Sequence, residues 1–501
     1  MAASTLLSPY TQLLRLARSG SPERAWSLMA QHGLLDSDSD DKALSLQARL
    51  VKDRAKRATT GAERARLFDQ SAQLYAKAAG LSGASYPLIN AASLSLFAGK
   101  PAQAQRFARQ VLDLIESDPE EGETPYWRAA TRSEALLLLD REEEARAALR
   151  EAIARQPQAW EDHAATLAQF ELILAEKGLG ANWLDAHRPP PSVHFSGIAR
   201  LAPDTRAVSE AIEHYIASER PGFAYGALAA GSDLLFAEAF IAWRDADCPA
   251  AELHVVLPLP IDQFRRLSVA AFGDHWLERF DAALAQATSA TVYGLDDPEL
   301  PLAVEYADLV AMGRAVRNAR VLESRAGAIT VVGKGESLRP QLASWRGRGR
   351  PLTIIEGVRA GETVLRSAPT HQRLQILVWA RDADGPAGTP PARRDVQRHG
   401  YLGGHWSLHD DLAEAGKLAK DLADGGDGAQ VAIVLAPCNP NDPSAPVLQR
   451  AAGLAAVATP GTVVADEATA MALIRAGWGG TIEELGELLL PSGREPIWSI
   501  G

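Results

Sequence analysis

The stretch YGALAAGSDLLFAE, from Tyr225 to Glu238, joins a short apolar run to a helix-forming run through a glycine-containing turn. Such a turn leaves backbone N–H groups at the positive end of a helix dipole, and its glycines let the backbone approach a ligand closely. That arrangement suits a phosphate or another anionic group. Ser232 or Asp233 could instead simply cap the helix. Because Asp233 puts negative charge where a phosphate would lie, the turn favours a ligand contacted through hydroxyls, such as a ribose.

Short apolar runs alternate with helix-forming runs on both sides of this turn. We expect strands at 193–197, 222–227, 253–258 and 290–293, and helices at 205–218, 233–243, 261–272, 276–286 and 302–321. This alternation predicts an α/β domain with a mostly parallel sheet covered on both faces. The run from Ile329 to Val332 could close the sheet. Ligands of such sheets bind at the carboxyl ends of the strands.

These segments resemble the SLOG superfamily, which includes LOG-type phosphoribohydrolases and DprA-like DNA-processing proteins. The resemblance covers about residues 192–335 and rests on Phe195 to Gly197, Tyr225 to Glu238 and Leu253 to Pro258. It is strongest to the SLOG-like domain found between tetratricopeptide repeats and a cyclase homology domain in bacterial proteins. The resemblance implies a Rossmann-like domain that binds a nucleotide or a nucleotide-derived ligand. The residues that would line its crevice are Ser196, Gly197, Gly226, Gly231, Ser232, Asp233, Glu238 and Pro258.

A nucleotide-processing hydrolase is the alternative for this domain, with Glu238 or Asp233 as the acid or base. Active LOG-type hydrolases carry a proline-glycine-glycine, glycine-threonine and glutamate motif, and nothing between Ala290 and Val332 matches it. The resemblance therefore gives no support to hydrolysis of a glycosidic bond. Glu238 could equally be a carboxylate on the helix surface.

Residues 1–188 are expected to form an all-α arm, because apolar residues recur there at steps of three and four. Between Asp140 and Pro157, a turn residue is followed by Ala145, Leu149 and Ala152. This spacing resembles the second helix of a tetratricopeptide repeat, in which small residues let helices approach and bulky ones fill the groove. A non-repeating helical bundle is the alternative. A repeat arm implies a protein partner bound by its helices.

Two breaks divide the remainder of the chain. The three prolines at 189–191 cannot continue a helix and predict a domain boundary. Residues 336–369 are expected to be a linker between the SLOG-like region and a last domain. This linker contains WRGRGRP, from Trp345 to Pro351, which is either an exposed connector or a phosphate-binding patch.

Residues 370–501 are predicted to form a second α/β domain of ferredoxin-like type. Val447 to Ala465 resembles the late part of a class III adenylyl/guanylyl cyclase domain, and Gly403 to Leu408 resembles that family's central hairpin. Cyclase chemistry needs two carboxylates to hold two metal ions and a cation to stabilise the transition state. A domain of this kind works as a face-to-face pair, so the resemblance also implies a possible homodimer.

The cyclase-like region departs from its family at all three catalytic positions. Arg381 and His405 stand at the two metal positions, and Gly453 stands at the position of the transition-state arginine. We therefore predict a degenerate cyclase domain without activity. An alignment shifted onto Asp382 or Asp384 is the alternative at the first metal position, and it leaves His405 and Gly453 unexplained. His405 and His409 are four apart on a possible helix start, which either binds a metal or is a surface pair.

Composition limits the function classes. The 501 residues carry a formal net charge of -12 with a sequence pI of about 5.5, which makes nucleic acid an unlikely main partner. The two cysteines form no zinc-binding pattern and predict the reducing cytoplasm. No apolar run approaches the length that spans a bilayer, so we expect no membrane association.

The combined hypothesis is a non-enzymatic sensor or scaffold that needs no cofactor. The arm would bind a protein partner, the SLOG-like domain would bind a nucleotide-derived small molecule, and the cyclase-like domain would dock or dimerise. Ligand binding in the middle domain would bias the arrangement of its neighbours. The alternatives are a nucleotide hydrolase and a purely structural interaction protein.

Overall fold

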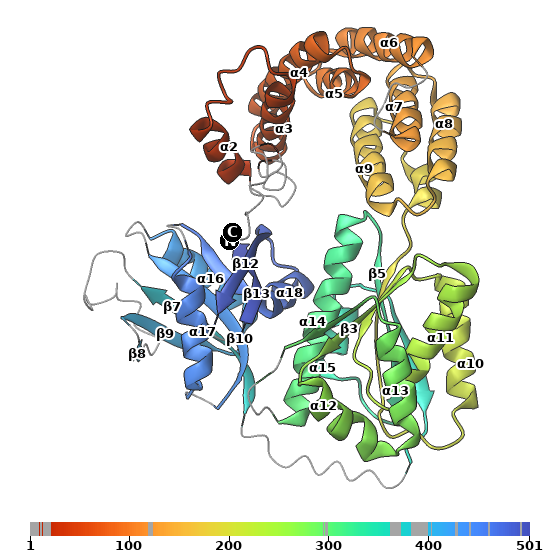
Figure 1. Cartoon of the computed structure of the whole chain (residues 1–501), viewed down its shortest axis with the longest axis vertical. Helices are drawn as coiled ribbons and strands as arrows, with labels where there is room; N and C mark the ends of the chain where they lie inside the picture. Colours follow the sequence, from red (N-terminus) through yellow and green to blue (C-terminus); the bar gives the residue numbers. More distant parts are fainter. Residues whose placement is uncertain are drawn as a thin grey trace, which may run out of the picture. The chain divides into compact units, whose positions relative to one another are not determined.

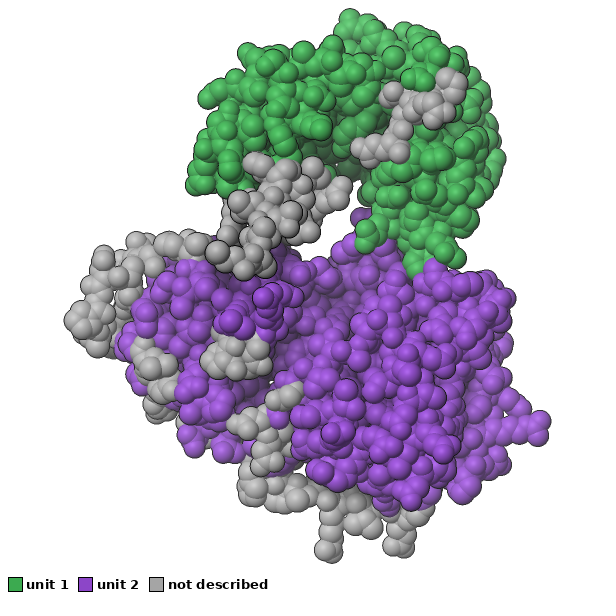
Figure 2. All heavy atoms as spheres, viewed as in Figure 1, with its two compact units in different colours: residues 1–189 green, residues 190–501 purple. Residues whose placement is uncertain are grey.

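The structure is a computed structural model of the chain. It describes residues 22–118, 124–293, 299–360, 372–381, 399–401, 403–425, 429–439, 442–458, 461–490 and 493–501, together with positions 10, 13 and 295. The chain forms two compact units, Met1–Pro189 and Pro190–Gly501, which Figure 2 shows in green and purple.

The first unit is a curved array of antiparallel helices. Its helices are α2 (Pro22–Gln31), α3 (Asp41–Arg57), α4 (Gly61–Ser82), α5 (Ser85–Phe97), α6 (Pro101–Ser117), α7 (Pro125–Leu138), α8 (Glu142–Arg155) and α9 (Trp160–Lys177). From α3 to α8 each helix packs on the next, and α5, α7 and α9 also contact one another. In Figure 1, α3, α5, α7 and α9 lie on the inner side of the curve. The prediction of an all-α arm is confirmed.

Local sequence explains where these helices begin and how they pack. The Asp40 side chain caps α3 by accepting from the N–H groups of Lys42 and Ala43. On α8, Ala145 and Ala152 are fully buried. The small residues predicted from the repeat spacing are therefore the ones at which α8 meets its neighbours.

The second unit begins with a six-stranded parallel sheet. Its strands are β1 (Ser192–Ser196), β2 (Phe223–Gly226), β3 (Glu252–Leu257), β4 (Ser289–Val292), β5 (Ala326–Gly333) and β6 (Leu352–Gly357), in the order β4-β3-β2-β1-β5-β6. Every neighbouring pair is parallel. The prediction of a parallel α/β sheet is confirmed.

Helices cover both faces of this sheet. They are α10 (Arg206–Glu219), α11 (Ser232–Asp247), α12 (Ile261–Phe264), α13 (His275–Ala285), α14 (Leu300–Val321) and α15 (Pro340–Gly347). Helices α10, α11 and α13 pack together, while α14 lies against β1, β2, β3 and β5. The rings of Phe195 and Phe236 stack with centroids 4.6 Å apart in the core under α11.

Several expectations about this region were wrong in detail. Strand β5 lies between β1 and β6 and does not close the sheet. The expected linker 336–369 contains α15 and β6, so part of it belongs to the fold. The Trp345 side chain is buried, and its Nε1–H donates to the carbonyl of Pro351 at 2.9 Å. The expected helix 261–272 is α12 followed by a π turn and a 3-10 turn.

The chain ends in a seven-stranded mixed sheet. Its strands are β7 (Arg373–Arg381), β8 (His399–Tyr401), β9 (Gly404–His409), β10 (Gln430–Cys438), β11 (Val463–Asp466), β12 (Ile482–Leu490) and β13 (Gly493–Ile500), in the order β12-β13-β11-β10-β7-β9-β8. Its helices are α16 (Leu412–Ala423), α17 (Ala445–Ala455) and α18 (Glu467–Ala476). The possible helix start at His405 and His409 belongs to strand β9, and the helix of this region begins at Leu412.

Candidate functional site

The glycine turn before α11 is packed against protein groups. Gly231 has a φ of 84°, and a Cβ at this position would lie 2.4 Å from the carbonyl oxygen of Ile198. The N–H of Ser232 donates to that same carbonyl at 3.1 Å, and the N–H of Ala230 donates to the carbonyl of Ser268 at 2.9 Å. Glycine is therefore required here by the close contact of two backbone segments. These two N–H groups are already used within the fold.

The other two glycines of the predicted crevice also mark close packing. A Cβ on Gly226 would lie 2.8 Å from ring atoms of Phe195, and a Cβ on Gly197 would lie 2.2 Å from the Ser232 Oγ. Ser232 is buried, and its hydroxyl donates to the backbone. A Cβ at any of these three glycines would meet neighbouring protein atoms, so the backbone of the turn is closely packed against the fold.

Asp233 is the buried carboxyl group at the start of α11. Burial and the nearby Asp308 together raise its pKa to about 8, while Arg339 and the backbone N–H groups of Ala229 and Gly197 act in the opposite direction. The carboxyl group is therefore largely protonated at neutral pH and can donate a hydrogen bond. It occupies the position at the helix start where an anion would otherwise bind.

A cluster of buried polar side chains lies near Asp233, and sequence analysis missed most of it. Asp308 on α14 accepts from Arg339 Nη1 at 2.7 Å and from Gln341 Nε2 at 2.9 Å. His194 Nε2 lies 3.7 Å from Asp308 Oδ1, and burial lowers the pKa of His194 to about 4. The His194 ring is therefore neutral. The available signal for His194 was a histidine between the apolar residues Val193 and Phe195 of a predicted strand.

The protonation of His194 can be assigned from its neighbours. Its Nδ1 lies 3.1 Å from the carbonyl oxygen of Tyr225, which can only accept, so Nδ1 carries the proton. Its Nε2 then has a lone pair. Within the described residues, neither this atom nor the buried Nη2 of Arg339 has a hydrogen-bond partner. This polar cluster, made of His194, Asp233, Asp308, Arg339 and Gln341, is therefore incompletely satisfied.

Ser196 continues the polar cluster along β1, whereas Glu238 and Pro258 do not. Ser196 lies on the same face of the sheet as His194, because side chains alternate along a strand, and its hydroxyl donates to Thr330 at 3.5 Å. Glu238 forms a two-point ion pair with Arg279 of α13. The carbonyl of Pro258 accepts from the N–H of Leu295. The structure thus brings Ser196 and Asp233 near one cluster and leaves Glu238 outside it.

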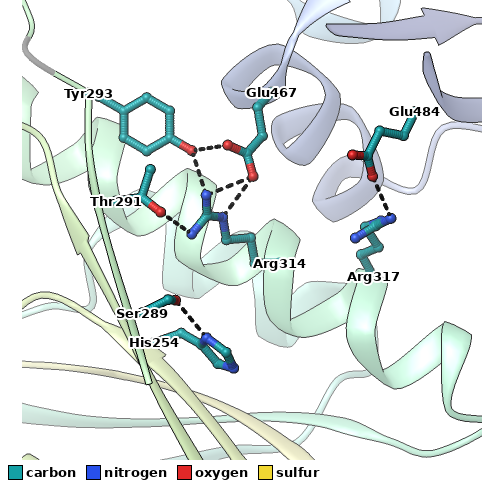
Figure 3. Close-up of polar contacts among 8 residues, drawn as sticks. All are labelled: His254, Ser289, Thr291, Tyr293, Arg314, Arg317, Glu467 and Glu484. Carbon is teal, nitrogen blue, oxygen red and sulfur yellow. Dashed lines mark hydrogen bonds and ion pairs between the residues drawn. The ribbon is translucent and has the colours of Figure 1, made fainter. Parts of the chain in front are cut away.

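A second polar network joins the two sheets of this unit (Figure 3). Arg314 of α14 donates to Glu467 of α18 at 2.9 Å, to Thr291 at 2.9 Å and to Tyr293 at 3.2 Å. Tyr293 also donates to Glu467 at 2.9 Å. Beside this network, a Cβ on Gly313 would lie 2.2 Å from the carbonyl oxygen of Met471. Helices α14 and α18 therefore pack at close range around a largely buried ion pair.

Two of the positions compared with cyclase catalytic residues lie on opposite faces of the mixed sheet. Residue Ala380 is paired with His405, so His405 and Arg381 lie on opposite faces of the sheet. Gly453 lies on α17, and the nearby Arg450 is engaged by Glu495 and by Asp466 at 3.3 Å. Asp382 and Asp384 lie outside the described residues.

The possible metal pair also has an unsuitable geometry. His405 and His409 both lie in strand β9, where four residues span about 13 Å rather than one helical turn. The helical i, i+4 geometry expected from the sequence is therefore wrong. Within the described ranges, no group of three or more His, Cys, Asp and Glu side chains could hold a metal ion.

The inner face of the arm carries a polar quartet made of Lys52 (α3), Ser93 (α5), Glu134 (α7) and Gln169 (α9). Lys52 Nζ donates to Gln169 Oε1 at 3.3 Å, while Gln169 Nε2 and Ser93 Oγ donate to Glu134 Oε1 at 3.1 Å and 2.5 Å. Burial lowers the pKa of Lys52 to about 8 and raises the pKa of Glu134. Side chains separated by up to 117 residues in sequence thus meet on one surface.

Comparison with known proteins supports the repeat assignment for the start of the arm. A family model described as Tetratricopeptide Repeats-Sensor matches residues 9–95, and no curated protein matches the chain. This match suggests protein interaction or sensing. Searched over its described residues, the structure contains no helix with the length and apolar character needed to cross a bilayer. The SLOG-like and cyclase-like assignments stay predictions.

Proposed function

We propose that this chain is a sensor whose helical arm binds a protein partner through the polar quartet on its inner face. The observation that carries this proposal is the convergence of Lys52, Ser93, Glu134 and Gln169 from four alternate helices. The family model that matches residues 9–95 supports a sensing role for the first part of the arm, which contains Lys52 and Ser93.

The quartet has hydrogen-bonding capacity left for a partner. Lys52 donates one hydrogen bond to Gln169, and Glu134 uses one carboxylate oxygen to accept two. Within the described part of the arm, Glu134 Oε2 accepts no hydrogen bond and Lys52 forms no ion pair. Lys52, Glu134 and Gln169 are each partly exposed to solvent. A partner that offers an acceptor to Lys52 and a donor to Glu134 would complete the set.

The test compares full-length variants that differ only on the inner or outer face of the arm. Lys52→Met combined with Glu134→Gln removes both charges and keeps the size of each side chain. Arg64→Gln combined with Arg66→Gln changes two exposed positions on the outer helix α4. A partner recovered by affinity purification should bind the purified inner-face variant at least tenfold more weakly and the outer-face variant unchanged. Equal binding by all three proteins would refute the proposal, provided circular dichroism shows the same helix content.

A nucleotide-derived ligand at the polar cluster is the second candidate function. The lone pair on His194 Nε2 needs a donor, and Nη2 of Arg339 needs an acceptor. A hydroxyl group supplies both, whereas a phosphate supplies only acceptors. The protonated Asp233 and the packed glycine turn also favour a neutral, hydroxyl-bearing group over an anion at this position.

Thermal-shift measurements with nucleosides and nucleotides test this second function. A nucleoside should raise the melting temperature of the wild-type chain, and Asp308→Asn should abolish the rise by releasing Arg339. If no nucleoside or nucleotide binds at millimolar concentration, the second function is wrong and the cluster is structural. In the same proposal the second sheet is a docking module without cyclase chemistry, because Arg381 and His405 provide no carboxylate.

A further inference from the structure

Four arginines gather where the C-terminal ends of three helices meet. Arg320 lies in the last turn of α14, Arg348 and Arg350 follow α15, and Arg475 lies in the last turn of α18. Arg350 Nη1 donates to the carbonyl of Arg475 at 2.7 Å, and the Arg350 guanidinium lies over the ring of Trp345. The Arg348 guanidinium reaches the C-cap of α18, because a Cβ on Gly477 would lie 3.2 Å from its Nη1.

This arginine cluster lacks the carboxylates that neutralise arginines elsewhere in the unit. Arg314, Arg339 and Arg359 each form an ion pair with a carboxylate. In the part of the chain that the structure describes, none of the four clustered arginines does so. Among the described residues, the Glu305 carboxylate raises the pKa of Arg475, against the larger opposing effects of burial and of Arg348 and Arg350. The cluster is therefore a local excess of positive charge on a chain whose formal net charge is -12.

The guanidinium of Arg475 is the least satisfied of the four. Its Nε and Nη1 atoms are buried, and no hydrogen-bond partner reaches them from the described residues. Burial and the charges of Arg348 and Arg350 together lower its pKa to about 10. A buried donor without an acceptor costs free energy, and neighbouring like charges add to that cost. An anion placed among the four side chains would remove both costs.

Helix-dipole stabilisation alone does not account for this cluster. One cation at a helix C-terminus stabilises that helix modestly, and Arg350 already contacts the end of α18 directly. Additional arginines at the same place repel one another. Arg320 and Arg348 are exposed and are within range to depress the pKa of Arg350, so they add positive charge to the same spot.

We propose that Arg320, Arg348, Arg350 and Arg475 form a binding site for a small polyanion, an oligophosphate group such as the one a nucleoside triphosphate carries. Guanidinium groups match phosphate oxygens through two-point hydrogen bonds, and several positive charges favour linked phosphates over a single one. Three of the arginines belong to the parallel sheet's region and Arg475 belongs to the mixed sheet's region. The bound anion would therefore hold these two regions together. This inference rests neither on the proposed arm function, whose variants lie in the arm, nor on the second candidate function, whose variant is Asp308→Asn.

Calorimetric titration of the full chain with tripolyphosphate tests the site, with orthophosphate as the comparison. We expect tripolyphosphate to bind more tightly than orthophosphate. Arg320→Gln combined with Arg348→Gln should weaken tripolyphosphate binding by about tenfold or more, because two of the four phosphate contacts are lost. The outer-face variant Arg64→Gln/Arg66→Gln removes the same charge elsewhere and should bind like the wild type. Unchanged affinity in the Arg320/Arg348 variant, an equal loss in the control, or no binding at millimolar tripolyphosphate would overturn the proposal.

Thermal unfolding without any anion gives a second, independent readout. Removing two like charges relieves repulsion, so the Arg320/Arg348 variant should unfold at the same temperature as the wild type or higher. A binding site that holds like charges together costs stability in the free protein, so removing those charges stabilises the fold. If the variant instead unfolds at a lower temperature, the arginines act as helix caps and the proposal is wrong. Titration with ATP then reports whether groups beyond the phosphates add affinity.

Discussion

At the scale of single residues, two buried titratable groups of the parallel sheet have pKa values shifted in opposite directions. In the fold the pKa of Asp233 is raised from 3.8 to about 8, and that of His254 is lowered from 6.5 to about 4, in both cases chiefly by burial. Each group is therefore neutral in the folded chain near pH 6. Burial disfavours the charged form of both groups, and for His254 it outweighs the nearby carboxylate of Glu252, whose Oε2 lies 2.9 Å from Nε2.

Asp233 should make the fold less stable as the pH rises. Between pH 3.8 and 8 the unfolded chain loses a proton from Asp233 that the folded chain retains, so the free energy of unfolding falls as pH increases through this window. Asp233→Asn removes this titration and keeps an oxygen that can accept from Gly197 or Ala229. The variant should match the wild type near pH 4 and exceed its free energy of unfolding at pH 8.5 by about 1.4 kcal/mol or more. Urea unfolding across this pH range measures the difference.

His254→Gln is the control, because its effect on the free energy of unfolding should grow as the pH falls. The unfolded chain gains a proton on His254 as the pH falls from 6.5 to 4, and the folded chain does not, so the wild type loses stability in acid. The glutamine variant should therefore differ from the wild type most at pH 4, where the Asp233 variant differs least. If the difference between Asp233→Asn and the wild type does not change with pH, the carboxyl group of Asp233 is not held protonated.

At the scale of helices and strands, the crossing of α14 and α18 depends on a single glycine. A Cβ on Gly313 would lie 2.2 Å from the Met471 carbonyl oxygen, which belongs to the backbone and cannot rotate away. Gly313→Ala should force the two helices apart and lower the free energy of unfolding by about 1–3 kcal/mol. The matched control is Gly80→Ala in α4, where nothing lies within 4 Å of the added Cβ. That change should raise stability by about 0.5–1 kcal/mol, because alanine is the better helix former.

Denaturant unfolding and hydrogen exchange distinguish the two glycine variants. Gly313→Ala should also speed exchange in the peptides that cover α14 and α18, whereas Gly80→Ala should leave those peptides unchanged. If the two alanine variants shift stability by equal amounts in the same direction, the close approach at Gly313 is not a determinant of the interface.

The periodicity of the sequence predicted most strands and helices, and it failed where local composition and tertiary packing disagree. The expected strands 193–197 and 253–258 match β1, which is buried at every position, and β3, which ends in a buried apolar run. Strand β6 was missed because the arginines and glycines just before it are typical of a linker. Its exposed Thr353 and Glu356 give the sequence no clear strand pattern.

The candidate sites were likewise predicted where the signal is local and missed where the contacting residues are distant in sequence. The turn at Gly231 could be predicted because glycine, serine and aspartate just before a helix are typical of a turn followed by a helix cap. The partners of Asp233 could not, since Asp308 and Arg339 come from elements 75 residues or more further along the chain. The Lys52–Gln169 contact joins two helices separated by 117 residues and is equally invisible to local patterns. For the arginine cluster, the part that the sequence indicated was the arginine-rich stretch after Trp345, which was predicted as a possible phosphate-binding patch.

At the scale of the whole second unit, the Arg314–Glu467 pair connects two sheets that could otherwise move independently. The side chains of Arg314 and Glu467 are 15% and 16% exposed, whereas those of Arg317 and Glu484, at the same interface, are 44% and 43% exposed (Figure 3). The two pairs join the same two regions and differ mainly in burial. Because solvent screens exposed charges, only the buried pair should hold the regions together.

Two double-mutant cycles should separate these pairs. Arg314→Leu and Glu467→Gln, singly and combined, should give a coupling energy of about 1–3 kcal/mol, because each single change leaves a largely buried charge or hydroxyl without its partner. Arg317→Leu and Glu484→Gln should give no more than about 0.5 kcal/mol, as for other exposed pairs. Urea unfolding of the full chain supplies the free energies, and hydrogen exchange in α14 and α18 reports whether the loss is local to the interface. Equal coupling in both cycles would mean that burial does not set the strength of this connection, and that the packing around Gly313 holds the two sheets together instead.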